Sequence, residues 1–93
     1  MRVEDEIREK LRRAFAPTEL EVVNDSHRHG GHGSSPGTGE SHFSVVVVSA
    51  AFAGKSRLER HRMVNAALAD ELKRSVHALA ITALTPEDHA RAS

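Results

Sequence analysis

Apolar positions recur every three to four residues along the first part of the chain, with charged residues between them. The apolar positions of this stripe are Val3, Ile7, Leu11, Ala14 and Phe15. This spacing predicts an amphipathic helix that turns one face toward a core. We expect the helix to end before Pro17, because a proline disfavours the α conformation in the residue that precedes it.

Three short apolar segments further along the chain predict strands, at residues 20–23, 43–49 and 75–82. The second segment holds four consecutive valines, which is typical of a central strand or one buried on both faces. A helix is expected over residues 57–74, between the second and third strands. Its start carries a capping-box pattern, in which Ser56 and Glu59 each cap a backbone N–H of the other.

The segment 27–42 has no such periodicity. It contains five of the six glycines and four of the seven histidines of the chain. A segment with so little apolar content cannot offset the entropy lost on ordering, so we expect a flexible His/Gly-rich loop. Residues 87–93 are expected to form a frayed tail that begins with a helical turn.

The predicted order is helix, strand, loop, strand, helix, strand and tail. Two strands that flank one loop are expected to pair antiparallel, whereas a strand reached through a helix runs parallel by a right-handed crossover. The chain therefore predicts an α+β, two-layer fold with helices on one face of a three-stranded mixed sheet.

Composition restricts the chemistry that this chain can perform. It has 13 Lys+Arg, 13 Asp+Glu, 7 His and no Cys. Without thiols it can form no disulfide, thiolate nucleophile or self-contained iron–sulfur site, so any metal held by the chain alone rests on His, Asp or Glu. The absence of a long apolar stretch argues against a membrane span, and the acidic start argues against a leader peptide. A cytoplasmic location is expected.

Four segments, in order along most of the chain, resemble the BolA family: 20–26, 40–43, 52–64 and 76–79. The third begins Phe-Ala-Gly-Lys-Ser-Arg-Leu-Glu-Arg-His-Arg and is long enough to be specific. The resemblance implies a single BolA-like domain over 1–93, with the α-β-β-α-β order of a type II KH-like fold. It also implies a non-enzymatic adaptor that binds a monothiol glutaredoxin and shares a [2Fe–2S] cluster, in iron–sulfur cluster trafficking or iron-dependent regulation.

By motif position, the resemblance places the cluster ligands of this chain at His29 and His77. The glutaredoxin would add its cysteine and the thiolate of a bound glutathione, so the isolated chain is expected to hold no cofactor. The loop is longer and richer in glycine than is usual in the family, and it has further histidines at His27 and His32. The loop ligand is therefore open among His27, His29 and His32.

These histidines also have plainer interpretations. Along the third predicted strand, His77 alternates with Leu79 and Ile81, which would turn it inward as a hydrogen-bonded core residue. The loop histidines would then be incidental members of a low-complexity segment, or a weak nickel or zinc site.

Four cations gather at the start of the second predicted helix, at Lys55, Arg57, Arg60 and Arg62. Cations at this end oppose the helix dipole, which makes the cluster more notable than an ordinary solvated face. It is suited to DNA phosphates, so a nucleic-acid-binding transcriptional regulator is the alternative function, or to an acidic glutaredoxin surface. No glycine elbow or oxyanion site accompanies the Ser, His and Asp residues, so neither catalysis nor a small-molecule substrate is expected.

Overall fold

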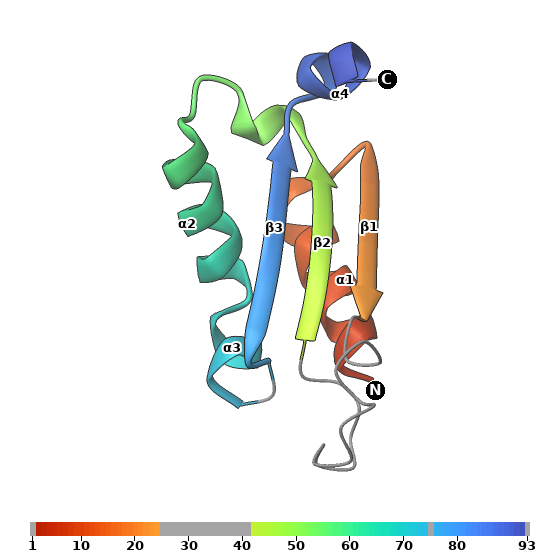
Figure 1. Cartoon of the computed structure of the whole chain (residues 1–93), viewed down its shortest axis with the longest axis vertical. Coiled ribbons are helices and arrows are strands. Elements are labelled where there is room, and N and C mark those ends of the chain that lie inside the picture. The colour runs from red at the N-terminus through yellow and green to blue at the C-terminus, as the bar shows by residue number, and fades with distance from the viewer. Residues whose placement is uncertain (1, 25–41, 75, 93) are drawn as a thin grey trace.

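The computed structural model describes residues 2–24, 42–74 and 76–92 (Figure 1). The elements are α1 (Val3–Phe15), β1 (Glu19–Asn24), β2 (His42–Val48), the 3-10 helix η3 (Ala50–Phe52), α2 (Arg57–Ala67), α3 (Ala69–Arg74), β3 (Ala78–Leu84) and α4 (Pro86–Ala92). The loop predicted at 27–42 falls outside this description except for His42. That residue begins β2, so the predicted loop boundary is wrong by this one residue.

The sheet has the order β1-β2-β3, with β2 antiparallel to β1 and parallel to β3. The valine-rich strand is central, as its pattern predicts. Residues of α1 and of α2 enter one buried cluster together with the alternate residues of β2, so both helices cover the same face of the sheet (Figure 1). The predicted α+β, two-layer architecture with a three-stranded mixed sheet is confirmed. The KH-like assignment stays a prediction.

The end of α1 is fixed against the 3-10 helix. Ala16 follows the helix in the left-handed conformation, with φ 45°, and the helix ends before Pro17 as predicted. The buried hydroxyl of Ser49 donates a hydrogen bond of 2.7 Å to the carbonyl of Phe15. The ring of Phe15 packs on that of Phe52, with 5.0 Å between the ring centroids. These contacts hold the carboxyl end of β2 against α1.

The helix predicted over 57–74 is interrupted in the structure. Leu68, at φ −107° and ψ 20°, separates α2 from α3. Leu68 is almost fully buried in the core cluster, and its amide and carbonyl both still form backbone hydrogen bonds. The periodicity of apolar residues continues through the break, which is why the sequence pattern predicts one helix.

The third strand begins and ends later than predicted, at 78–84 instead of 75–82. The amide of Val76 donates to the carbonyl of Glu71, so the residues just before Ala78 close α3 instead of joining the sheet. At the other end, Leu84 pairs with Val48 and its carbonyl accepts a hydrogen bond from the Ser49 amide. β3 therefore pairs with β2 along the whole length of both strands.

The helical turn predicted at the start of the tail is part of a longer helix, α4, over Pro86–Ala92. Fraying of the tail stays a prediction. The Thr85 hydroxyl accepts from the Asp88 amide at 3.0 Å, and the Asp88 carboxylate accepts from the Thr85 amide at 3.2 Å. These reciprocal bonds cap the helix, and Pro86 suits its first position because φ is already fixed there. None of the helices described is long and apolar enough to cross a membrane.

Candidate functional site

His77, a predicted metal ligand, is exposed to solvent at a bend just before β3. The inward orientation that strand alternation predicts for it is wrong, because β3 begins only at Ala78 and the alternation does not extend back to position 77. Leu79 and Ile81 do pack against the core, as expected. The imidazole is therefore placed where a second molecule can reach it.

The end of the sheet that carries His77 is also where the segment 25–41 joins the fold. In the strand register His42 pairs with Ala78, and Asn24 pairs with Phe43. Asn24 therefore lies two strand spacings, roughly 10 Å, from the third strand. The His/Gly-rich segment is therefore attached at this end of the sheet, with its His42 end beside Ala78 and its Asn24 end two strands away.

Chain length alone allows any of the three loop histidines to approach His77. His29 follows Asn24 by five residues, and that length of extended chain spans about 17 Å. His27 follows Asn24 by three residues, which span about 10 Å, and His32 by eight, which span about 27 Å. All three lie outside the residues that the structure describes, so the choice of loop ligand stays a prediction.

An ion pair between the half-exposed Lys10 and the buried Glu71 supports the turn that carries His77. The carboxylate of Glu71 in α3 is 1% exposed, and its Oε2 lies 2.8 Å from Nζ of Lys10 in α1. Nζ of Lys10 donates its hydrogen bond to Oε1 of Glu71, at 3.0 Å. In the described part of the chain, Oε2 of Glu71 accepts no hydrogen bond, although it lies close to the ammonium. The Glu71 hydrogen bond raises the pKa of Lys10. This pair fixes α3 on α1, and the Val76–Glu71 backbone bond continues that support toward His77.

Sequence reasoning missed this pair, and no local signal reveals it, since 61 positions separate Lys10 from Glu71. Within residues 2–24, 42–74 and 76–92, no three His, Asp or Glu side chains form a group that could hold a metal ion.

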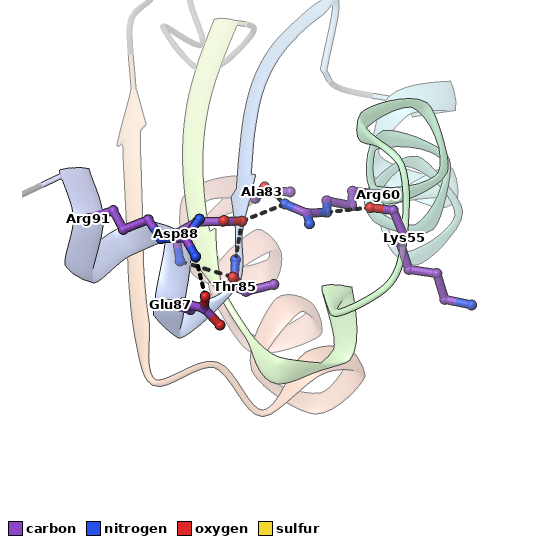
Figure 2. A network of polar contacts seen from close by, with 7 residues as sticks. All are labelled: Lys55, Arg60, Ala83, Thr85, Glu87, Asp88 and Arg91. Carbon is purple, nitrogen blue, oxygen red and sulfur yellow. Dashed lines mark hydrogen bonds and ion pairs between the residues drawn. The ribbon is translucent and has the colours of Figure 1, made fainter.

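The second candidate site is the start of α2, where Arg60 is the centre of a network (Figure 2). Its Nη1 donates to the Ala83 carbonyl at 3.1 Å and to Oδ2 of Asp88 at 3.0 Å, and its Nε donates to the Lys55 carbonyl at 3.0 Å. Only 18% of the Arg60 side chain is exposed. This guanidinium therefore joins the start of α2 to the end of β3 and to α4.

The other three cations of the predicted cluster, Lys55, Arg57 and Arg62, are exposed. Figure 2 shows the Lys55 side chain directed away from the Arg60 network. The structure thus divides the predicted set into one arginine with an internal role and three cations that face solvent.

Two carboxylates adjoin these cations, and each has a lowered pKa. The pKa of Asp88 is lowered first by the Thr85 amide, then by Arg60 and the Thr85 hydroxyl. The pKa of Glu59 is lowered first by the Ser56 amide and hydroxyl, and then by the charges of Lys55 and Arg62. Both hydrogen bonds of the predicted capping box are present. Glu59 therefore supplies the anion that the amino end of α2 favours.

Sequence reasoning did not single out Thr85 and Asp88. Their Thr-x-x-Asp spacing, with a proline at the first helical position, is the signal that could have identified them.

A family model described as BolA-like protein matches residues 11–88 of this chain. The chain belongs to the BolA family. The resemblance noted in the sequence is therefore confirmed.

Human BolA-like protein 1 is 56% identical over 84 residues, which cover 90% of this chain and 58% of the human protein. The DNA-binding transcriptional regulator BolA of Escherichia coli is 49% identical over 85 residues, which cover 91% of this chain and 77% of that protein. The solved structure of BolA1 from Arabidopsis thaliana matches with a TM-score of 0.85 at 36% identity, covering 94% of this chain and 95% of that one. Neither of the first two names denotes an enzyme.

Much of the BolA-like block at 52–64 has a structural role in this fold. Phe52 is fully buried in the core. Gly54 has φ +75°, a conformation that favours glycine. Ser56 caps α2, and Arg60 binds the end of β3. Other side chains of the block are exposed and available to a partner, among them Lys55, Arg57, Leu58 and Arg62.

Proposed function

We propose that this BolA-family protein binds a monothiol glutaredoxin and shares a [2Fe–2S] cluster with it, acting in iron–sulfur cluster trafficking or iron-dependent regulation in the cytoplasm. The observation that carries the proposal is the exposed imidazole of His77, at the end of the sheet where the His/Gly-rich segment is attached. The cluster is the cargo of the pair of proteins.

The available donors suit half of such a site. Two imidazoles can replace two thiolates on one iron of a [2Fe–2S] cluster, which raises its reduction potential. His77 and one loop histidine, with His29 favoured over His27 and His32, would be the donors of this chain. Since the chain has no Cys, the sulfur donors would be the glutaredoxin cysteine and its glutathione.

Coexpression with a monothiol glutaredoxin, followed by visible absorption and circular dichroism, tests the proposal. We expect a coloured complex, and we expect His77→Ala to alter its spectrum and shorten the lifetime of the cluster several-fold. His89→Ala is the matched control, because it removes a histidine from α4, at the opposite end of the sheet (Figure 1).

Single replacements of His27, His29 and His32 would then identify the loop ligand. An unchanged spectrum and lifetime in His77→Ala would contradict the ligand assignment. A colourless but stable complex would contradict cluster sharing and would show that the two proteins dock without a cluster.

Nucleic-acid binding is a second candidate function. It is favoured by the three exposed cations at the start of α2 and by the Escherichia coli relative that is named a DNA-binding transcriptional regulator. Titration with duplex DNA at two salt concentrations tests it. Affinity should fall steeply with salt, and Arg57→Ala should reduce the salt slope by about one. Absence of binding at low salt would exclude this function.

A further inference from the structure

One edge of the sheet presents backbone groups without a strand partner. β3 is an edge strand, and the carbonyl of Leu84 faces β2, where it accepts from Ser49. The carbonyl of Ala83 faces the other way, where it accepts from Arg60. Because these groups alternate sides along a strand, those of Leu79 and Ile81 point outward like those of Ala83. Within the described part of the chain, the outward groups of Leu79 and Ile81 form no hydrogen bond.

The exposed edge of β3 lacks the usual protection against strand pairing. Its sequence, Ala-Leu-Ala-Ile-Thr-Ala-Leu, contains neither a charge nor a proline. The opposite edge, β1, carries exposed Glu19 and Glu21. Charged residues and prolines commonly prevent an edge strand from pairing with another chain. The two edges therefore differ, and β3 is the one suited to accept a further strand.

A groove of about 360 Å³ lies between this edge and α2. Figure 1 shows α2 beside β3, on the side away from β2. The groove is lined by residues 81–84 of β3 and by three side chains of α2, namely Arg57, Arg60 and His61. Arg57 is exposed, whereas Arg60 is occupied by Ala83 and Asp88. Lys55 and Arg62 are not among the lining residues, and Glu59 is held in the capping box, so Arg57 is the exposed cation of the groove.

We propose that this groove binds an acidic, extended segment of a partner protein, which adds to β3 as a fourth strand. Its backbone would pair with the outward groups of Leu79 and Ile81. Side chains of an added strand alternate between the two faces of the sheet. Carboxylates at every second position would therefore face Arg57 and His61. The residues between them would lie on the other face of the sheet, beside the exposed Ala80 and Thr82.

A peptide fits this edge better than a nucleic acid does. The outward groups of β3 include both N–H donors and carbonyl acceptors. A peptide backbone repeats both groups at the spacing of a strand, whereas in a nucleic acid the phosphates only accept and donors come from base edges and sugar hydroxyls. The chain has no Trp or Tyr, and its three phenylalanines, Phe15, Phe43 and Phe52, are buried, so no ring of Phe, Tyr or Trp is available to stack on a base. A second copy of the chain would bring its own β3, which contains no acidic residue.

The test uses a capped peptide of alternating Glu and Val, matched in length to β3, and a Lys/Val counterpart. We expect the Glu/Val peptide to bind, with amide exchange slowed at Leu79 and Ile81. N-methylation of its alternate amides should abolish binding. Arg57→Glu should weaken binding about tenfold, and the variant should still fold, since an acid is favourable at the first position of a helix. Arg12→Glu, on exposed α1 surface, is the control of equal charge change.

Equal binding of the Lys/Val peptide, or slowed exchange in β1 in place of β3, would overturn the proposal. So would self-association that protects the β3 amides without peptide, which would identify a second copy as the occupant. A single-stranded oligonucleotide that displaces the peptide from these amides at lower concentration would identify a nucleic acid instead.

Discussion

Arg60 and Asp88 are joined by a hydrogen-bonded ion pair of 3.0 Å that spans 28 positions of the sequence. The same guanidinium nitrogen also donates to the Ala83 carbonyl. A residue that looks like part of a basic binding surface is thus a structural link between α2, β3 and α4. The remaining exposed cations are the ones to test for binding.

Arg60→Ala should lower the free energy of unfolding by about 1–3 kcal/mol, because the change removes the hydrogen-bond donor of the part-buried Ala83 carbonyl. Arg60→Lys should restore only part of the loss, since one ammonium cannot reproduce the fork of guanidinium donors. Urea denaturation measures both values. Arg57→Ala is the control and should change stability by less than about 0.5 kcal/mol. A similar loss in both alanine variants would contradict the structural role of Arg60.

The attachment of α4 should depend on acid. The pKa of Asp88 is lowered in the folded protein, first by the Thr85 amide and then by Arg60. Its contribution to stability is therefore complete above the unfolded pKa of about 3.9 and is lost as the pH falls through the lower folded value. NMR titration of the α4 amides should show little change between pH 7 and 5 and a transition below about pH 4. The transition should be absent in Asp88→Asn, and its persistence there would assign it to another group.

The capping box of α2 should contribute measurably to stability. Ser56 accepts from the Glu59 amide at 3.1 Å, and Glu59 accepts from the Ser56 amide at 3.2 Å. Ser56→Ala should cost about 1 kcal/mol, as is typical for loss of an N-cap side chain. Ser56→Asp retains an acceptor and should remain close to the original stability in thermal denaturation. Equal losses in the two variants would show that the cap hydrogen bond is not the cause.

The Lys10–Glu71 pair should be needed for the position of His77. Lys10→Met should destabilise the fold, because it removes the nearest cation of the buried Glu71 carboxylate and leaves only Arg74, at 3.9 Å. The double variant Lys10→Met/Glu71→Leu should recover much of the loss. Chemical denaturation reports stability, and the NMR signals of the His77 ring report the turn. Lys73→Met, which replaces an exposed lysine in α3, is the control. Unchanged His77 signals in Lys10→Met would show that the ion pair does not position the turn.

The Lys10–Glu71 pair should also make the free energy of unfolding fall at high pH. The pKa of Lys10 is raised in the folded state by its hydrogen bond to Glu71. Its stabilising effect is present below the unfolded value of about 10.4 and is lost as the pH rises through the higher folded pKa.

The features predicted correctly from sequence depend on neighbouring residues. Pro17 ends α1, the valine run forms the central strand, and Ser56 with Glu59 begins α2. Each of these signals lies within a few positions of its effect. Local propensity and apolar periodicity were therefore sufficient for the architecture.

The features that the sequence did not predict depend on contacts between distant residues. The break at Leu68 lies in an uninterrupted apolar pattern, and the start of β3 is set where Val76 closes α3. The exposure of His77 follows from that shifted strand start. The charge of Arg60 is visible in the sequence, but its partners Ala83 and Asp88 are identified only by the fold.

The pairing of β1 with β2 has a consequence for variation in the connection between them. Val22, Phe43 and Val45 face the core, so a slip of one residue would turn a whole row of apolar groups to water. Side-chain burial thus holds the two strands in register, while the cost of closing the intervening stretch grows only with the logarithm of its length. Insertions and substitutions can therefore accumulate in that connection at small energetic cost, while the strands that it joins keep their pairing.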